Sequence, residues 1–529
     1  MTLPRLSAIA IVALGSMLLA HTSTLRAAEI DRSLILTPPA PETPRINGPD
    51  TFGVRPGSPF LYTIPASGKA PLDYAASGLP PGLQLDPRTG RITGVLKEEG
   101  THTITLAARN TLGSSKKTFK IVVGSQLALT PPMGWSSWNC WGASVSQEKV
   151  LGSAKAIVDR GLQAHGWTYV NIDDGWQGKR GGKLNAIQPN YKFPDMAGLG
   201  RELHAMGLKF GIYSSPWQGT YAGFIGSSSP NKNGTCDWIE AGDHNEFYRI
   251  STEHEAPRPK KLSIRKFGEF PFVTNDVSQW SEWGVDYLKY DWHPLDVPHV
   301  EEMTKALRKT DRDIIYSLSN GADHKFANDY QRLSNLWRTT GDIRDNWQRL
   351  KDIGFSQDKW APHGGPGHWN DPDMMILGMV GIDEAMHPTR LTPDEQYTHV
   401  SLWCLLSAPL LIGCDLAQLD DFTCSLLTND EVLAIDQDAL GKSATRVNGE
   451  GDLAVYAKPL EDGSIAVGLF NLSPTEAVIT ARWEDLKLGK DQQMTARDLW
   501  RQQDLGTFTA KFEAKVASHG VVLVKLVPR

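Results

Sequence analysis

The sequence predicts an α/β protein built on a (β/α)8 TIM barrel, flanked by an N-terminal Ig-like β-sandwich and a C-terminal antiparallel β-sandwich. Three observations predict this arrangement. The chain has 529 residues, which is enough for about three domains. Both ends carry short β-type runs separated by Gly, Pro and Asn. Between them, short apolar strands alternate with amphipathic helices, which is the order typical of a barrel.

The first 28 residues predict a signal peptide. Arg5 precedes an apolar run over residues 6–20, and small residues follow up to Ala27 and Ala28. The run is shorter than the ~20 residues that a membrane span needs, and no basic stop-transfer flank follows it. We expect export to the periplasm or the extracellular space, with no stable membrane insertion after cleavage. An uncleaved membrane anchor is the alternative.

Residues 29–39 form a Pro-rich linker, and residues 40–124 predict the N-terminal sandwich. The runs "PFLYTIPAS", "GTHTITLAARN" and "SKKTFKIVVG" are rich in Val, Ile, Thr and Phe. The stretch "GLPPGLQLDPRTGRITGVLKEEGTHTITLAARNTLG" resembles the immunoglobulin-like or cadherin-like modules of secreted bacterial enzymes. Residues 438–529 return to a β pattern in "LAVYAKPLEDGSIAVGLFNLS" and "EAVITARWEDL", which predicts the C-terminal sandwich.

Residues 128–435 predict the barrel. The eight candidate strands, each with its exit, are "MGWSSWN", "YVNIDDGW", "FGIYSS", "DYLKYDW", "IIYSLSNG", "NLWRTTGDI", "HWNDPDM" and "PLLIGCDL". Helix signals separate several of them. Ser146 is a candidate N-cap, and Thr392 with Glu395 forms a capping box around Pro393. The expected apolar face of the first of these helices consists of Val150, Ala154, Ile157 and Val158.

Polar side chains gather where these strands end. Active sites of TIM barrels lie at the carboxyl ends of the strands. A carboxylate there often caps the next helix, but carboxylates at four exits, together with Lys289 and Arg338, favour a functional site. The carboxylates are Asp173, Asp174, Asp291, Asp342 and Asp373.

Two facing carboxylates are sufficient to hydrolyse a glycoside. In "DYLKYDWHP", Lys289 and Asp291 share a strand face, and the lysine should favour the ionised carboxylate that a nucleophile needs. Asp342 is then the candidate acid/base, although Arg338 on the same strand face would oppose its protonation. Asp345 is the rival carboxylate in this stretch and is expected to be solvated or to cap a helix.

Six motifs in order, "LTPPMGWSSWN", "NIDDGWQ", "KFGIYSS", "YLKYDW", "LWRTTGDI" and "WNDPDMMILG", closely resemble family 27 of the glycoside hydrolases. These are α-galactosidases and α-N-acetylgalactosaminidases. The resemblance covers about residues 128–435, and the C-terminal sandwich is also typical. It implies a retaining double displacement on an α-galactoside of an oligo- or polysaccharide, with Asp291 as nucleophile and Asp342 as acid/base.

The resemblance also implies a set of substrate contacts. Trp138 would pack on the apolar face of galactose, and Asp173 and Asp174 would accept its 4- and 6-hydroxyls. Lys289 would donate to hydroxyls near the nucleophile, and Arg338 would lie near the 2-position. Two more residues, Tyr213 and Asp373, would line the same pocket.

The sequence departs from the family pattern in two places. Some animal members join two strand exits by a disulfide where this chain has Tyr221 and His293. In "SLSNGADH", Ser319 and Ala322 stand where galactosidases often carry Glu and a bulky residue. Small residues there would admit a 2-acetamido group, so an α-N-acetylgalactosaminidase is an alternative.

Other function classes fit the sequence less well. A β-L-arabinopyranosidase would typically replace a carboxylate that serves the 6-hydroxymethyl group, and both Asp173 and Asp174 are kept. A non-catalytic carbohydrate-binding protein should lack Asp291 or Asp342. The net charge of −6 and the lack of a long basic run argue against nucleic acid. We expect no metal and no cofactor, because His293, His363 and His368 lack metal-ligand spacing. Five cysteines do not form a disulfide framework, and the oligomeric state stays open.

Overall fold

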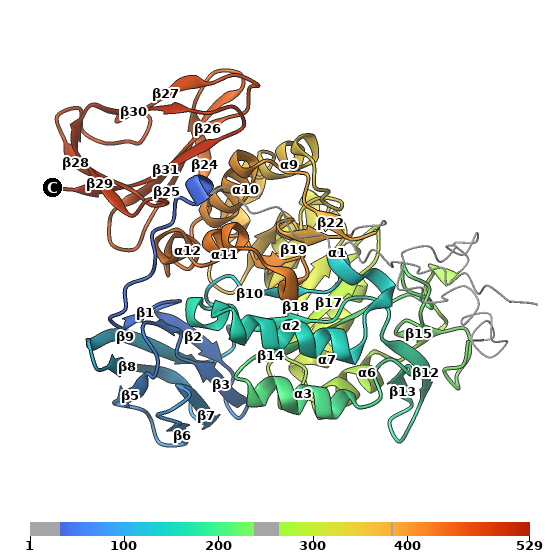
Figure 1. Cartoon of the computed structure of the whole chain (residues 1–529). Coiled ribbons are helices and arrows are strands. Elements are labelled where there is room, and N and C mark those ends of the chain that lie inside the picture. Colours follow the sequence, from blue (N-terminus) through green and yellow to red (C-terminus); the bar gives the residue numbers. More distant parts are fainter. Residues whose placement is uncertain (1–31, 237–263, 382–384) are drawn as a thin grey trace, which may run out of the picture.

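The computed structural model describes residues 32–236, 264–381 and 385–529. The expected signal peptide, residues 1–28, lies outside the described residues, as does part of the long segment between two barrel strands. Three β-rich or barrel units follow one another along the chain, and the two sandwiches lie on the same side of the barrel in Figure 1. Among the described residues, no helix combines the length and hydropathy needed to cross a bilayer.

The barrel consists, in the described residues, of eight parallel strands with the order β20-β19-β18-β17-β14-β11-β10-β23. A parallel bridge between Met375, just beyond β20, and Ile412 in β23 closes it. All eight expected strands are confirmed, because each apolar run lies buried among its neighbours. Their bounds are β10 Met133–Ser136, β11 Tyr169–Asn171, β14 Lys209–Ser214, β17 Tyr287–Asp291, β18 Ile315–Ser319, β19 Leu336–Arg338, β20 Trp369–Asp371 and β23 Leu410–Ile412.

Helices surround the strands in the order expected for a barrel (Figure 1). The backbone N–H of Lys149 donates to Ser146 Oγ, which confirms the predicted N-cap. The predicted face was wrong about Val158, which is 40% exposed and lies beside the buried stripe rather than in it. The bounds are α1 Trp138–Trp141, α2 Gln147–Asp159, α3 Met196–Ala205, α6 Val273–Trp283, α7 Val297–Arg308, α8 Ala327–Leu333, α9 Trp347–Gly354, α10 Pro393–Leu406, α11 Asp421–Leu427 and α12 Asp430–Asp436.

Helix α10 lies between the barrel and the C-terminal sandwich. Its capping box is formed as predicted, with Thr392 and Glu395 exchanging hydrogen bonds. Almost every residue from Glu395 onward is buried. A helix that is buried on all sides carries apolar residues around its whole circumference and not on one face alone. Helix α10 contacts β26 and β31 of the sandwich as well as α9.

The N-terminal sandwich packs two main sheets, with orders β2-β9-β8-β5 and β3-β7-β6, around a core of its own. It contacts the barrel through polar groups: Thr63 Oγ1 donates to the carbonyl of Gly207 and Asn47 Nδ2 to that of Ala164. Its strands are β1 Arg45–Ile46, β2 Thr51–Val54, β3 Pro59–Thr63, β4 Ala66–Ser67, β5 Asp73–Ser77, β6 Leu83–Leu85, β7 Arg91–Val95, β8 Gly100–Asn110 and β9 Gly113–Val123.

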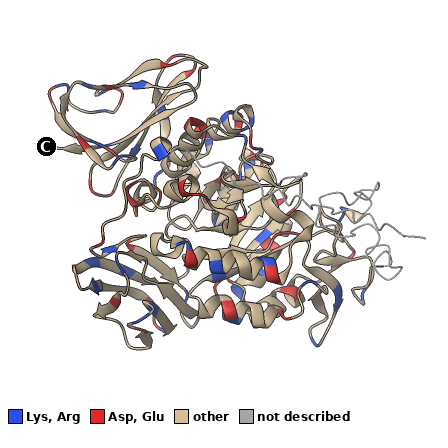
Figure 2. Ribbon diagram, viewed as in Figure 1, with Lys and Arg blue, Asp and Glu red and all other residues tan. Residues whose placement is uncertain are grey.

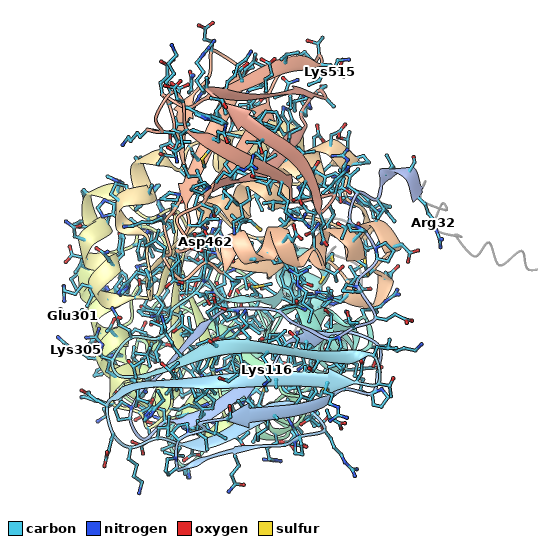
Figure 3. All side chains as sticks on the ribbon, turned by 90° about the vertical axis from the view of Figure 1, so that its left-hand side faces the viewer. Arg32, Lys116, Glu301, Lys305, Asp462 and Lys515 are labelled. Atoms are coloured by element: carbon cyan, nitrogen blue, oxygen red, sulfur yellow. The ribbon has the colours of Figure 1, made fainter. Side chains whose placement is uncertain are left out.

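The C-terminal sandwich has a sheet of order β24-β25-β26-β31-β28-β29, faced by the pair β27-β30. Figure 3 views the molecule from the left-hand side of Figure 1, with the C-terminal sandwich and Lys515 above and the N-terminal sandwich and Lys116 below. Charged residues of both signs are interspersed along all three units (Figure 2). The strands are β24 Thr445–Asn448, β25 Leu453–Pro459, β26 Ile465–Asn471, β27 Ala477–Arg482, β28 Gln493–Asp498, β29 Gln503–Thr509, β30 Lys511–Val516 and β31 Val521–Pro528.

Candidate active site

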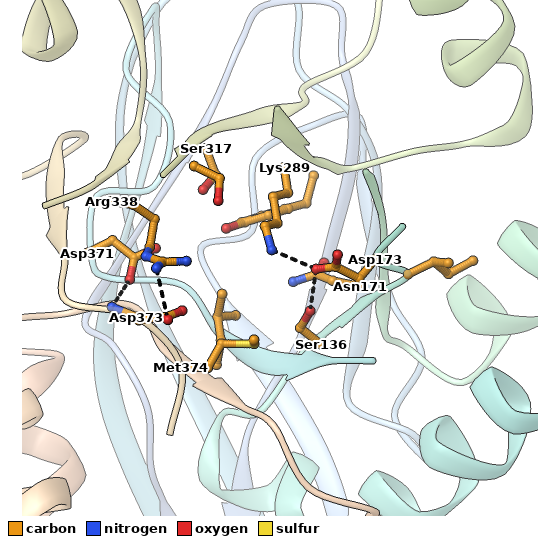
Figure 4. A pocket seen from close by; sticks show the side chains of 13 residues that line it. Ser136, Asn171, Asp173, Lys289, Ser317, Arg338, Asp371, Asp373 and Met374 are labelled. Carbon is orange, nitrogen blue, oxygen red and sulfur yellow. Dashed lines mark hydrogen bonds and ion pairs between the residues drawn. The ribbon is translucent and has the colours of Figure 1, made fainter. Parts of the chain in front are cut away.

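A polar pocket opens within the barrel, among the carboxyl ends of its strands (Figure 4). The space not occupied by protein atoms there is about 370 Å³ when the solvent at the mouth is included. Of the residues expected from the sequence, Asp173, Lys289, Ser319, Arg338 and Asp373 line it directly. The complete lining is Ser136, Asn171, Ile172, Asp173, Tyr287, Lys289, Ser317, Ser319, Arg338, Asp371, Asp373, Met374 and Leu411.

Asp291 is the last residue of β17 and is only 5% exposed. Its two carboxylate oxygens are held by neutral donors. The Tyr213 hydroxyl donates to Oδ2 at 2.9 Å, and Asn320 Nδ2 donates to Oδ1 at 2.7 Å. Burial raises the pKa of Asp291 to about 6, against the opposing charge of Lys289. Lys289 favours the ionised form of Asp291, as predicted, but desolvation outweighs the lysine and the net pKa is raised.

Lys289 forms its ion pair with Asp173 rather than with Asp291. Its Nζ lies 2.8 Å from Asp173 Oδ2, and Figure 4 shows the lysine pointing across the pocket to that carboxylate. Ser136 Oγ also lies 3.4 Å from the same oxygen, and the backbone N–H of Asp174 donates to the other one. Two side chains on the same face of one strand thus have different partners in the barrel.

Asp174 turns away from that pair toward the segment after β14. Thr220 Oγ1 donates to one of its oxygens at 2.8 Å and the backbone N–H of Ala222 to the other at 2.7 Å. Burial raises the pKa of Asp174 to about 7 despite these two donors. A carboxylate has about four acceptor positions, so Asp174 keeps capacity for further donors.

Arg338 joins two carboxylates at the opposite wall. Its Nη2 lies 3.1 Å from Asp342 Oδ1 and 2.9 Å from Asp373 Oδ2. Asp373 is buried, whereas the side chain of Asp342 is 51% exposed. Burial acts to raise the pKa of Asp342, but the charges of Arg338 and Lys289 outweigh it and hold that pKa below its usual value. Arg338 therefore opposes protonation of Asp342, as expected from the sequence.

The loop that carries Asp342 is anchored at several points. The N–H of Ile343 donates to Asp373 Oδ2, and Arg349 Nε donates to the carbonyl of Asp342. Asp345, the rival carboxylate, is buried and accepts hydrogen bonds from the backbone and guanidinium of Arg390. Its carboxylate is therefore a structural anchor of the loop and is not part of the pocket lining.

Three other expected residues are not among those that line the pocket. The Tyr213 hydroxyl donates to Asp291. Trp138 begins α1 directly after the exit of β10 and is partly buried against the barrel core. Ala322 donates its backbone N–H to the carbonyl of Arg338, and its side chain is packed in the core. Ala322 is not among the lining residues, so only Ser319 of the two specificity candidates faces the pocket.

Sequence reasoning missed several polar residues of the site, among them Asp371 and Asn171 in the pocket lining and Asn320 beside Asp291. Asp371 is buried, and burial raises its pKa to about 6. Asn171 is 3% exposed, and within the described residues neither polar atom of its amide has a partner. Both lie two residues before a carboxylate that was predicted, so the period-2 rule for strands could have found them. Asn320, which contacts Asp291, follows β18 in a loop that carries no such periodicity.

A parallel (β/α)8 barrel with buried carboxylates, a lysine and an arginine at its strand exits is the design of a barrel glycoside hydrolase. The chain matches the family model "Alpha galactosidase A" over residues 130–237 and 262–438. A model for the "Alpha galactosidase C-terminal beta sandwich domain" matches residues 450–526, and an Ig domain model matches residues 43–124. The chain therefore belongs to the α-galactosidase family, family 27 of the glycoside hydrolases, with an N-terminal Ig-like module.

Individual relatives agree with this assignment. Alpha-galactosidase 2 of Arabidopsis thaliana is 35% identical over 418 residues, covering 78% of this chain and 92% of the relative. A candidate α-galactosidase structure from Bacteroides fragilis has a TM-score of 0.78 at 31% identity, covering 92% of this chain and 97% of its own. A family 27 β-L-arabinopyranosidase from Geobacillus stearothermophilus has a TM-score of 0.62 at 29% identity, covering 76% and 97%.

Proposed function

We propose that the protein is an exo-acting, retaining α-galactosidase that removes terminal α-D-galactosyl residues from oligo- or polysaccharides. One observation carries this proposal within the family: the buried carboxylate Asp291 ends β17 two residues after Lys289, and the ion pair of Lys289 with Asp173 lines the pocket. Such a pocket suits a single sugar whose hydroxyls replace water around the polar groups.

The first chemical step is assigned to Asp291 and Asp342. A carboxylate oxygen of Asp291 attacks the anomeric carbon while the bond from that carbon to the leaving oxygen breaks. Asp342 transfers its proton to the leaving oxygen. The products of this step are the free aglycone alcohol, a galactosyl ester on Asp291 and an ionised Asp342.

The second step reverses these roles. Asp342 takes a proton from water, whose oxygen attacks the anomeric carbon, and the ester bond to Asp291 breaks. Galactose leaves with the α-configuration, Asp291 is again a carboxylate, and Asp342 is again protonated. The two displacements together retain the stereochemistry.

In the free site, the nucleophile Asp291 holds a proton more readily than the acid Asp342 does. The pKa of Asp291 is raised to about 6 and that of Asp342 is lowered, so a single shared proton prefers Asp291. Substrate binding would change this balance, because the half-exposed Asp342 would lose water beneath the sugar. Desolvation and a hydrogen bond to the leaving oxygen both favour the neutral acid. A contact between Arg338 and the 2-hydroxyl would weaken the ion pair of Arg338 with Asp342.

Sugar recognition is assigned to the remaining polar groups. We assign Asp173 and Asp174 to the 4- and 6-hydroxyls and Lys289 to the ring hydroxyls near the nucleophile. Trp138 is assigned to the apolar face of the ring. Asn171 adds an amide without a partner among the described residues. We further propose that residues 1–28 direct export to the periplasm or the extracellular space, since that segment has the charge and hydropathy pattern of a signal peptide.

A second candidate activity is favoured by Ser319, which is small, buried and part of the lining. Space beside it could admit a 2-acetamido group, as in an α-N-acetylgalactosaminidase. A β-L-arabinopyranosidase is the third possibility on this scaffold. Rates on matched aryl α-galactoside, α-N-acetylgalactosaminide and β-L-arabinopyranoside decide among them. We expect the galactoside to give the highest kcat/KM, and preference for either other sugar would replace the proposal.

The same assay tests the nucleophile. Asp291→Asn should be folded and essentially inactive on every one of these substrates, because each needs the same attack. External azide should restore part of the activity by entering the vacated space. Near wild-type turnover by Asp291→Asn would refute the proposed mechanism.

A further inference from the structure

Asn320, the residue directly after β18, contacts the proposed nucleophile. Its Nδ2 donates to Asp291 Oδ1 at 2.7 Å. The backbone of Asn320 has a φ of 78° and that of Gly321 a φ of 62°. Asn is one of the few side chains that adopt this left-handed region without difficulty. The chain thus turns back at the end of β18 and holds the Asn320 amide against the end of β17.

Loops from two other strands meet Asn320. His293, two residues beyond Asp291, places its Nδ1 3.2 Å from the carbonyl oxygen of Asn320. Tyr221, in the segment after β14, interacts through its hydroxyl with the Asn320 side chain. The Tyr221 ring lies under the guanidinium of Arg265, 4.7 Å from the ring centroid. Asn320 is therefore held through its backbone carbonyl by His293 and through its side chain by Tyr221.

The Asp291 carboxylate consequently has one neutral donor on each oxygen. The Tyr213 hydroxyl from β14 holds Oδ2 and the Asn320 amide holds Oδ1. Two donors on opposite oxygens fix the rotation of the carboxylate plane, and both favour its ionised form. An amide has no titratable proton, so the Asn320 contact acts at every working pH.

We infer that Asn320 is a positioning residue that orients Asp291 for attack and keeps it ionised. The inference rests on the proposed function of Asp291 as nucleophile. Lys289 does not orient the Asp291 carboxylate, because its ammonium group is paired with Asp173. The side-chain amide of Asn320 orients it instead. In the part of the chain that the structure describes, no side-chain hydrogen bond joins Asp291 to Ser319 or Ala322, the neighbours singled out by the sequence.

Asn320→Gly is the sharpest test, since glycine keeps the positive φ and only the amide is lost. We expect kcat on an activated aryl α-galactoside to fall by about 10- to 100-fold, the range for one hydrogen bond to a charged group. KM should change little, and the acid limb of kcat/KM should move to higher pH. Asn320→Asp should move that limb further, because a second carboxylate beside Asp291 disfavours its ionisation.

Two controls distinguish a specific effect on Asp291 from a general loss of folding. Asn185 also has a positive φ, of 48°, but lies in the turn between β12 (Gln177–Gly181) and β13 (Ala186–Pro189). Asn185→Gly should leave kcat, KM and the pH profile unchanged. Thermal unfolding should show each variant to be folded. If Asn320→Gly does not fold, Asn320→Asp, which keeps the size of the side chain, carries the test.

The outcomes are distinguishable. A wild-type acid limb and kcat in Asn320→Gly, with Asp291→Asn inactive, would overturn the inference and leave the proposed function intact. A loss of kcat with an unmoved acid limb would also overturn it, because the residue would then act only on the loop. Activity in Asp291→Asn would instead overturn the proposed function itself.

Discussion

At the scale of single residues, the two proposed catalytic carboxylates have opposite surroundings. Asp291 is 5% exposed and is bonded only to neutral donors, whereas the Asp342 side chain is 51% exposed and pairs with Arg338. Burial therefore raises the pKa of one, and neighbouring cations lower the pKa of the other. The pH dependence of catalysis should reflect these two environments separately.

The first prediction concerns that pH dependence. Asp291 must be ionised to attack, and its pKa is about 6 in the free protein, so kcat/KM on an activated aryl α-galactoside should fall as the pH drops through about 6. Above that pH the profile should be flat, because such a leaving group needs little help from an acid. A profile that rises toward pH 4 would contradict the assignment of Asp291.

Asp342→Ala should separate the two chemical steps. Glycosylation by an activated substrate should survive without the acid, while hydrolysis of the intermediate loses its base. We expect a burst of phenol followed by a slow steady state, and a kcat/KM on a disaccharide that is reduced by about 10²–10⁴-fold. Equal losses on both substrates without a burst would transfer the acid/base role to another carboxylate, with Asp373 the nearest candidate.

At the scale of elements, the segment between β19 and α9 connects the pocket to the C-terminal sandwich. Trp347, the first residue of α9, stacks on His519 with ring centroids 4.2 Å apart and planes 11° apart. His519 Nδ1 lies 2.7 Å from Glu395 Oε1, and the other oxygen of Glu395 closes the capping box of α10. The sandwich therefore supports the loop that carries Asp342, five residues before Trp347.

Removing this support should affect acid catalysis selectively. We expect His519→Ala to lower kcat/KM on a disaccharide by about 3- to 10-fold, the equivalent of losing one aromatic contact of ~1 kcal/mol. The rate on an activated aryl α-galactoside should remain close to that of the wild type, since it depends little on Asp342. Lys515→Ala, on an exposed strand of the same sandwich, is the matched control. Equal losses on both substrates would indicate a general effect on folding.

At the scale of the whole molecule, both sandwiches are attached to the barrel by polar contacts, which are partly buried at Arg55 and fully buried at Lys458. Arg55 of the N-terminal sandwich pairs with Asp313 at 2.6 Å and donates to the carbonyl oxygens of Arg308 and Thr310. On the other side, Lys458 is fully buried and donates to Ser407 Oγ and to the carbonyl of Ile435, near the C-terminal ends of α10 and α12. A cation is favoured at such helix ends.

The Arg55 contacts predict that the Ig-like module stabilises the barrel and is not a loosely tethered spacer. Arg55→Ala should reduce the free energy of unfolding by about 1–3 kcal/mol, because the 16%-exposed Asp313 loses its charged partner. Activity at 25 °C should be unchanged, since Arg55 lies far from the pocket along the barrel. Arg88→Ala, at an exposed turn of the same module, should have no effect. Thermal or urea unfolding measures both, and equal stability of the two variants would contradict the prediction.

Local patterns predicted much of this architecture. The eight strands, the N-cap at Ser146 and the capping box at Thr392 depend on neighbouring residues along the chain, and each was recognisable there. The gathering of Asp173, Lys289 and Arg338 at one pocket followed from a single rule, that parallel strands end on the same face of a barrel. The family resemblance covered the same part of the chain.

Tertiary structure alone decided which of these residues contact one another. Period-2 alternation places Lys289 and Asp291 on one strand, but it does not say that the lysine pairs with Asp173 across the barrel or that Asn320 bonds to Asp291. The exposure of Val158 and the raised pKa of Asp291 likewise depend on everything packed around them. A sequence determines its own strands and helices through local contacts, whereas partners and burial arise from segments far apart in the chain, which only the folded molecule brings together.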